Sequence, residues 1–259
     1  MNPVITLLSD WHLRDPYVAM LKGALLQALP DAQIIDITHY VDKFNVLQTA
    51  LLMKSSYSAF PEGSIHLILT NMSLNSTFSP VMLEHKGHYF IGEDNGVFHL
   101  MFGQEVALKG FQLSDKQGNT LTQIQQWIRM INEGSMNEHN TSEYVQFKRM
   151  FVQESEYNSE NQQIEGNIVY VDAFNNAITD IPVKMFKEKG QNLPFTATIH
   201  SKGVWKMTRH FDCYESADDE MYLCDNALGY IEVASYQSDV AILADLEPGD
   251  KIIIQFGEE

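Results

Sequence analysis

Polar residues that could take part in catalysis or ligand binding follow two apolar runs in the first hundred residues. Asp10 and His12 come after Val4–Leu8, and Asn71 comes after Ser64–Thr70. A carboxylate accepts hydrogen bonds from two hydroxyl groups, an amide donates and accepts, and an imidazole can move a proton near neutral pH. If both runs are parallel strands, their carboxyl ends meet at one sheet edge, where α/β proteins bind ligands. The alternatives are a turn or cap role for Asp10 and a structural or surface role for His12.

The elements around these residues alternate between two patterns. Short apolar runs are typical of buried parallel strands, and the segments between them repeat apolar residues at helical spacing. This order predicts a doubly wound α/β sheet with right-handed crossovers. The expected strands are Val4–Leu8, Gln33–Ile37 and Ser64–Thr70, and the expected helices are Pro16–Leu29 and Asn45–Tyr57, the second capped by Asn45.

The pattern changes along the rest of the chain, which completes the α/β domain and then continues into a linker and a strand-rich domain. A hairpin is expected around Lys86-Gly87 and a helix over Leu121–Ile131, followed by a stretch rich in Glu, Asn and Ser. We predict an N-terminal α/β domain over 1–132, a divergent linker with one short helix over 133–165, and an antiparallel β-barrel domain over 166–259. The strand-like runs of the last domain are Asn167–Val171, Phe195–His200, Val204–Met207, Met221–Cys224, Tyr230–Ala234 and Lys251–Phe256.

Composition narrows the possible partners. Acidic residues outnumber basic ones by 34 to 17, and the resulting net charge of −17 repels nucleic acid and anionic lipid, so we expect neither as a partner. The two cysteines, Cys213 and Cys224, form no CxxC pair and predict no disulfide framework. The N-terminus lacks signal-peptide features, and no apolar run approaches the ~20 residues that span a bilayer, which favours a cytoplasmic protein.

Metal and cofactor motifs are absent from the sequence. His85 and His88 flank the expected hairpin turn, and no Cys, His or carboxylate set has metal-ligand spacing. No glycine-rich phosphate loop, dinucleotide fingerprint or nucleophile elbow is present. We therefore expect neither a metal nor a cofactor.

Six ordered segments resemble a known family. They are ITLLSDWHLRDPYVAMLKG, IIDITHYV, FPEGSIHLILTN, GHYFIGEDNGVF, GNIVYVDAFNNAITDI and NALGYIEVA. Each is similar to a signature of the S-adenosylmethionine (SAM) hydroxide adenosyltransferases, which are adenosine-forming SAM hydrolases related to the fluorinase and chlorinase. The resemblance covers both halves of the chain and fails over roughly 133–163.

The resemblance implies a fold, an assembly and a reaction. It implies an α/β domain and a β-barrel domain, a homotrimer, and a small-molecule nucleoside ligand in a cleft between the domains. The implied reaction is displacement of methionine from the 5′ carbon of the adenosyl group, with SAM as substrate or ligand.

The resemblance also assigns roles to individual residues. Asp10 would meet the ribose hydroxyls, Asp172 the amino-acid end of the ligand, Phe174 one face of adenine, and Asn176 an adenine edge, where an amide supplies both donor and acceptor. Asn175 replaces a family glycine and tolerates the positive φ that such a turn needs. Further expected ligand positions are Ala227, which replaces a serine, together with Glu232 and Ser235.

The water-activating triad of the family is altered. Asn71 stands where the family has an aspartate, and Phe78 stands where it has an arginine. The family histidine falls in the unmatched linker, where its motif is missing. Because an amide cannot act as a base, Asn71 would only bind or orient water. His12, which replaces a glycine, is a substitute base, a plug in the ribose site or a surface residue.

Three functions agree with these residues. The first is slow SAM hydrolysis with Asn71, His12 or backbone groups positioning water, aided by alignment and desolvation. The second is a catalytically impaired protein that binds adenosine or SAM. The third is adenosyl transfer to another nucleophile, such as a halide.

Overall fold

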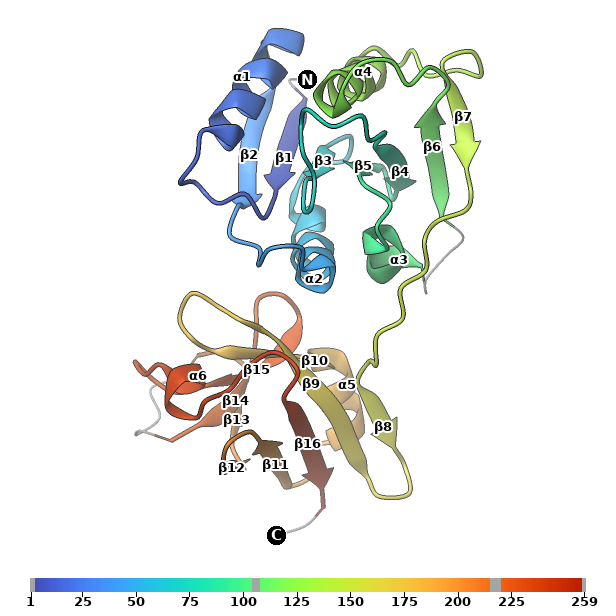
Figure 1. Ribbon diagram of the computed structural model, residues 1–259. Helices are drawn as coiled ribbons and strands as arrows, with labels where there is room; N and C mark the ends of the chain where they lie inside the picture. The colour runs from blue at the N-terminus through green and yellow to red at the C-terminus, as the bar shows by residue number, and fades with distance from the viewer. Residues whose placement is uncertain (1–2, 104–107, 215–219, 258–259) are drawn as a thin grey trace. The chain divides into compact units, whose positions relative to one another are not determined.

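The chain folds into two compact units, Met1–Phe151 and Val152–Glu259. The computed structural model (Figure 1) describes residues 3–103, 108–214 and 220–257. Each unit has its own sheet and its own hydrophobic core. The units are therefore described one at a time.

The first unit is built on a seven-stranded mixed sheet in the order β2-β1-β3-β5-β4-β6-β7. Strands β2, β1 and β3 are parallel, as the alternating pattern predicted, and the β4–β5 hairpin lies where Lys86-Gly87 indicated it. The parallel pairing of β5 with β3 was not predicted. The strands are β1 (Val4–Leu8), β2 (Gln33–Thr38), β3 (Ile65–Ile68), β4 (Val81–His85), β5 (His88–Gly92), β6 (Lys109–Leu113) and β7 (Thr141–Tyr144).

Helices cover both faces of this sheet, which confirms the doubly wound α/β interpretation. The α1 and α4 helices share one core with the sheet, and α2 and α3 share another on the opposite face (Figure 1). The Asn45 side chain caps α2, as predicted, by accepting from the Gln48 N–H at 2.9 Å. The helices are α1 (Tyr17–Ala28), α2 (Val46–Ser56), the short 3-10 helix η1 (Tyr57–Ala59), α3 (Val97–Phe102) and α4 (Thr120–Glu133).

The expected short helix in residues 133–165 is wrong. After α4 ends at Glu133, this stretch contains β7, β8 (Glu156–Asn158) and the start of β9, but no further helix. The β7 strand pairs with β6 at the sheet edge, and β8 pairs with β9 in the second unit. Long-range strand pairing therefore decides the structure of a stretch whose local sequence has no clear periodicity.

The second unit is rich in strands, as predicted. Its strands pair in the order β12-β11-β16-β9-β10-β15-β14-β13, and the described residues form a curled sheet in which closure into a barrel is not observed. One face carries the core, which includes Ile168, Ile199 and Ile254. The elements are β9 (Gln163–Val171), β10 (Ala177–Pro182), α5 (Val183–Gly190), β11 (Phe195–His200), β12 (Val204–Met207), β13 (His210–Phe211), β14 (Tyr222–Asp225), β15 (Tyr230–Ala234), α6 (Val240–Leu243) and β16 (Lys251–Phe256).

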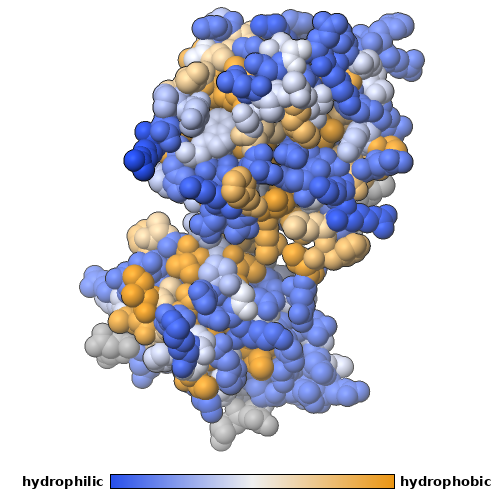
Figure 2. All heavy atoms as spheres, in the orientation of Figure 1, coloured by the Kyte–Doolittle hydropathy of each residue, from blue (hydrophilic) through white to orange (hydrophobic). Residues whose placement is uncertain are grey.

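The surface is mainly hydrophilic on the face shown in Figure 2, with apolar side chains scattered between polar ones. Among the described helices, none has the length and apolar character needed to span a bilayer.

Buried histidines connect three neighbouring interior strands of the first sheet, β1, β3 and β5. The Thr6 hydroxyl lies 2.7 Å from His66 Nδ1, and His66 Nε2 lies 3.0 Å from His88 Nδ1. His66 is fully buried and stacks on Phe90 with ring centroids 4.8 Å apart. Burial, together with the neighbouring His88, lowers the pKa of His66 to about 3, so the folded protein keeps this ring neutral.

We expect the free energy of unfolding to fall as the pH is lowered from 7.5 to 5.0. Between the unfolded pKa of His66, near 6.5, and its folded pKa of about 3, only the unfolded chain binds the proton. This one residue should lower the free energy of unfolding by roughly 2 kcal/mol over that interval. Urea unfolding followed by tryptophan fluorescence would measure the difference. His66→Phe should reduce the pH dependence, whereas His139→Gln, at an exposed position, should leave it unchanged.

Candidate ligand-binding site

The first group of candidate residues lies at the carboxyl edge of the parallel strands. Asp10, which is 8% exposed, accepts at Oδ2 from the Phe44 N–H at 3.0 Å and from the Asn71 N–H at 3.2 Å. One carboxylate thus ties together the segments that follow β1, β2 and β3. The structure therefore brings Asp10 and the Asn71 backbone together, as the sheet-edge argument predicted.

The backbone around Asp10 is unusual. His12, Phe44 and Asn71 have φ values of 58°, 64° and 60°, a left-handed region that costs energy for residues other than glycine. Hydrogen bonds hold these conformations: the Phe44 and Asn71 N–H groups bind Asp10, and the His12 N–H donates to the His39 carbonyl at 2.8 Å. Left-handed backbone concentrated in one loop cluster is typical of functional sites.

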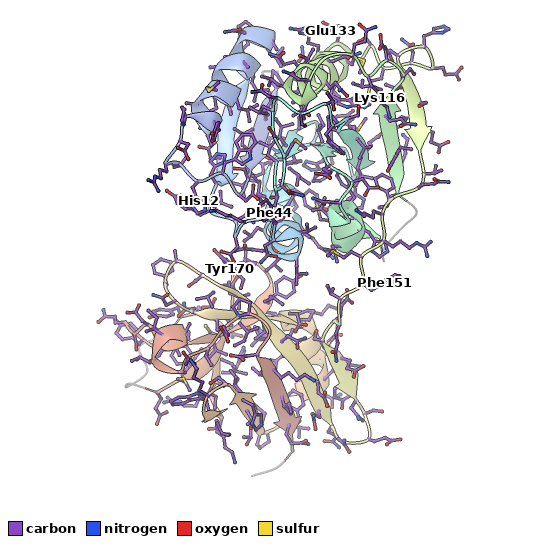
Figure 3. The ribbon with its side chains drawn as sticks, viewed as in Figure 1. His12, Phe44, Lys116, Glu133, Phe151 and Tyr170 are labelled. Carbon is purple, nitrogen blue, oxygen red and sulfur yellow. The ribbon has the colours of Figure 1, made fainter. Side chains whose placement is uncertain are left out.

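Phe44 was not predicted from the sequence. Its side chain is 67% exposed, and Figure 3 shows it with His12 in the loops at this edge of the first unit. Its position directly before the Asn45 cap was the available signal. Nothing in the local sequence, however, predicts a left-handed aromatic residue there.

A Ser–His–Asp chain, in which the serine and histidine are buried and the aspartate is exposed, supports the loop that carries Asp10. Ser9 Oγ lies 2.7 Å from His39 Nδ1, and His39 Nε2 lies 3.2 Å from Asp36 Oδ1. Burial opposes the ionisation of Asp36, but hydrogen bonds from Lys22 and His39 outweigh it and lower the pKa of this carboxyl. Because Ser9 is fully buried, its hydroxyl cannot reach a substrate. It instead accepts from the Trp11 N–H at 3.3 Å and so orders the turn.

The candidate catalytic side chains make few contacts. The Asn71 side chain is exposed, and no described residue hydrogen-bonds to it. The half-buried His12 ring meets Tyr40 edge-on at 5.2 Å and also lacks a hydrogen bond within the described chain. At the family arginine position, Phe78 contacts the start of α4 through its main-chain carbonyl, which accepts from the Thr120 hydroxyl at 2.8 Å. The side chains of Asn71 and His12 are thus free to meet a ligand, whereas the bond at Phe78 involves its main chain and does not depend on its side chain.

An apolar groove adjoins this edge. Its volume is about 590 Å³, and its walls include Trp11 and Met72, the residues that follow Asp10 and Asn71. The Trp11 indole donates to the Met72 carbonyl at 3.0 Å, which fixes the ring against the loop after β3. Tyr17 and Met20 of α1 also line this groove. The first unit therefore places a buried carboxylate next to apolar surface.

The second group of candidate residues lies in a turn of the second unit. Asp172 Oδ1 accepts from the Phe174 and Asn176 N–H groups, each at 2.9 Å. Asn175 has a φ of 57°, which confirms that asparagine supports the turn at this glycine position, and its amide donates to Asp239 at 2.9 Å. The Phe174 ring is 76% exposed, so its faces are available for stacking.

Next to this turn lies a buried polar cluster. Glu232, which is 6% exposed, accepts from Asn176 Nδ2 at 3.4 Å, from Cys224 Sγ at 3.3 Å and from Asn226 Nδ2. Burial raises the pKa of Glu232, hydrogen bonds from Asn226 and Cys224 lower it, and the charge of Asp172 raises it further, with a net upward shift. Cys224 and Asn226 were not among the predicted site residues.

The remaining predicted positions separate along β15. Ser235 is buried immediately after the strand, near the same end as Asn176. Ala227 is exposed in the hairpin turn before β15, at the strand's opposite end. The structure thus brings Asp172, Phe174 and Asn176 together with Glu232, but leaves Ala227 apart from Ser235.

One described cluster has metal-ligand side chains. His210, Asp212 and Asp225 offer ligand atoms within 4.8 Å of one another. The Lys187 ammonium already lies 2.7 Å from Asp212 and 2.6 Å from Asp225. These groups are therefore explained as an ion-pair network.

Comparison with known proteins yields two matching family models. The N-terminal domain of SAM hydroxide adenosyltransferase matches residues 5–144, and the C-terminal domain of the same family matches residues 166–253. The (R)-S-adenosyl-L-methionine hydrolase of Methanocaldococcus jannaschii is 23% identical over 267 residues, covering 97% of this chain and 95% of that protein.

Two further similarities are informative. The fluorinase of Nocardia brasiliensis is 32% identical over 82 residues, which span 32% of this chain and 27% of that protein. The crystal structure of a conserved protein from Thermotoga maritima has a TM-score of 0.82 at 20% identity, covering 97% of this chain and 99% of that one. This structural likeness supports the fold.

Proposed function

Because the chain belongs to the SAM hydroxide adenosyltransferase family, we propose that it binds an adenosyl ligand and slowly hydrolyses S-adenosyl-L-methionine to adenosine and methionine. The observation that carries this proposal is the buried Asp10 carboxylate, held by two backbone N–H groups at the sheet edge. The similarity of nearly the whole chain to a named SAM hydrolase supports the choice of substrate.

The proposed chemistry makes modest demands on the protein. Water oxygen forms a bond to the 5′ carbon while the carbon–sulfur bond breaks, and the electron pair of that bond neutralises the sulfonium. Methionine leaves as a neutral thioether, and the attacking water releases one proton to solvent. The protein must align water with the carbon–sulfur bond and exclude other water, and the reaction needs no metal or cofactor.

We assign the ligand contacts as follows. Asp10 accepts from the ribose hydroxyls, Phe174 stacks on adenine, Asn176 binds the adenine edge, and Asp172 meets the amino-acid end. Asn71 orients the attacking water through its amide, with His12 as the alternative group for this task. Ser235, Glu232 and Ala227 complete the proposed set, with Ala227 least supported because its turn lies at the far end of β15.

A second candidate function is binding without turnover. It is favoured by the altered triad, since Asn71 offers an amide in place of a base and Phe78 offers an apolar ring in place of a guanidinium. The chain would then hold a nucleoside and leave it unchanged.

Calorimetry and product analysis separate these functions. The protein is titrated with S-adenosyl-L-methionine and with adenosine, and each mixture is analysed by chromatography after long incubation. Adenosine and methionine appearing together support hydrolysis, whereas adenosine binding without product supports the second function. Absence of binding by both ligands contradicts the proposal. Parallel incubations with fluoride or chloride test transfer to halide, and light scattering tests the homotrimer we also expect.

Replacing Phe174 by alanine should weaken adenosine binding about 5- to 150-fold, because stacking on one aromatic ring contributes ~1–3 kcal/mol. The ring is 76% exposed, so thermal unfolding should barely change. Phe151→Ala removes a ring that is 81% exposed in the first unit and serves as the matched control. Equal adenosine affinities for Phe174→Ala and wild type would exclude stacking on this ring.

A further inference from the structure

A chain of hydrogen bonds in the second unit ends on the proposed adenine-binding amide. It begins at the Leu228 N–H, which donates to Asn226 Oδ1 at 2.6 Å. It continues from Asn226 Nδ2 to Glu232 Oε2, and Asn176 Nδ2 donates to Glu232 Oε1 at 3.4 Å. Asn176 and Glu232 are 5% and 6% exposed, so these contacts are largely shielded from water.

The start of this chain fixes the orientation of the first amide. A backbone N–H only donates, so the Asn226 atom that meets Leu228 must be the oxygen. The Asn226 nitrogen therefore faces Glu232, and the carboxylate oxygen there must accept. The Leu228 N–H therefore distinguishes the oxygen of the Asn226 side chain from its nitrogen, two atoms that are otherwise easily exchanged in an asparagine.

The Glu232 carboxylate, which accepts from Asn226, also fixes the orientation of the Asn176 amide. Ionised Glu232 has acceptors only, and Cys224 Sγ also donates to Oε1 at 3.3 Å. Asn176 must then present its nitrogen to Glu232 and its oxygen elsewhere. Within the described chain, nothing donates to Asn176 Oδ1, so a buried amide has an open acceptor.

We propose that Glu232 is a positioning residue that locks the Asn176 amide with its oxygen toward the ligand and so selects 6-aminopurine nucleosides over 6-oxopurine nucleosides. This inference rests on the proposed nucleoside binding and adds its base specificity. The exocyclic amino group of adenine donates to Oδ1, and the second Nδ2 hydrogen of Asn176 remains free for adenine N7. A 6-oxopurine would set its oxygen against Oδ1, with two acceptors facing each other.

The alternative role for Glu232 and its hydrogen-bond partners is to stabilise the sheet without affecting ligand specificity. A carboxylate that only stabilised β14 and β15 would affect the binding of all purines equally. A positioning role instead changes the ratio of affinities between purines that differ at position 6. The decisive readout is therefore this ratio rather than the affinity for any one nucleoside.

The test uses calorimetry at pH 8, where carboxylates are ionised, with adenosine, purine riboside and inosine as probes. Wild type should bind adenosine at least 30-fold more tightly than inosine, with purine riboside between them. Glu232→Gln presents either a donor or an acceptor to Asn176, so the amide can turn and the ratio should fall below about 5-fold. Cys224→Ala removes one donor but keeps the chain of amides, and its ratio should match wild type.

The outcomes separate the two proposals. If wild type binds none of the probes, the proposed function fails and the inference fails with it. If wild type and Glu232→Gln both bind adenosine with an unchanged ratio to inosine, only the positioning role is overturned. Thermal unfolding checks that each variant folds. Should Glu232→Gln not fold, Glu232→Ser removes the carboxylate acceptor that fixes the Asn176 nitrogen and carries the same expectation.

Discussion

Replacing Asp10 by alanine should weaken adenosine binding at least 100-fold. We assign this carboxylate to the two ribose hydroxyls, and a hydrogen bond to a charged group contributes ~1.5–3 kcal/mol. Losing two such bonds exceeds the ~2.7 kcal/mol that corresponds to 100-fold. Asp10→Asn, which keeps the size of the side chain beside the Phe44 and Asn71 N–H groups, should have a smaller effect. Isothermal titration calorimetry would measure both.

A second ligand distinguishes this contact from damage to the loop. Wild type should bind 2′,3′-dideoxyadenosine far more weakly than adenosine, because the deoxy ligand lacks both donors. Asp10→Ala should bind the two nucleosides almost equally. Once the carboxylate is gone, the ribose hydroxyls have lost their partner, so removing them as well should cost little further affinity, as in a double-mutant cycle. If Asp10→Ala still prefers adenosine as strongly as wild type does, Asp10 does not bind the ribose.

Replacing Asn71 by aspartate should raise the rate of SAM hydrolysis about 100-fold. A positioned general base contributes roughly 10²–10⁴-fold, and an amide cannot supply it. The site accommodates the change because the Asn71 side chain is exposed and its φ of 60° is one that aspartate tolerates. The neighbouring Asp10 carboxylate, which binds the Asn71 N–H at 3.2 Å, should raise the pKa of the introduced carboxyl toward the range useful for a base.

The rate is measured as the initial formation of adenosine and methionine by chromatography. Asn71→Ala is the matched control and should not exceed the wild-type rate. His12→Ala in the Asn71→Asp background tests whether the imidazole shares the task. If Asn71→Asp binds adenosine normally but forms it no faster than wild type, the position after β3 no longer holds the attacking water.

Several features of the fold could be predicted because they depend on local sequence. The short apolar runs identified β1, β2 and β3, and the spacing of Val18, Leu21 and Leu25 identified α1, because burial on one face leaves a periodic pattern. The α2 cap and the left-handed Asn175 were equally predictable from single residue types. The strands β7 and β8 were missed because pairing with distant strands creates them.

The sequence also determined which residues are candidates for the site, but not which partners they bind. Polar residues after β1 and β3 pointed to the sheet edge, and the motif around Phe174 pointed to its turn. Only the tertiary structure decided that Asp10 holds Phe44 and Asn71, which lie 34 and 61 positions away. It likewise decided that Asn176 meets Glu232, 56 positions later. Residue type and spacing encode local conformation and burial, whereas the partner of a polar side chain is set by strand order and register, which exist only once the whole sheet has formed.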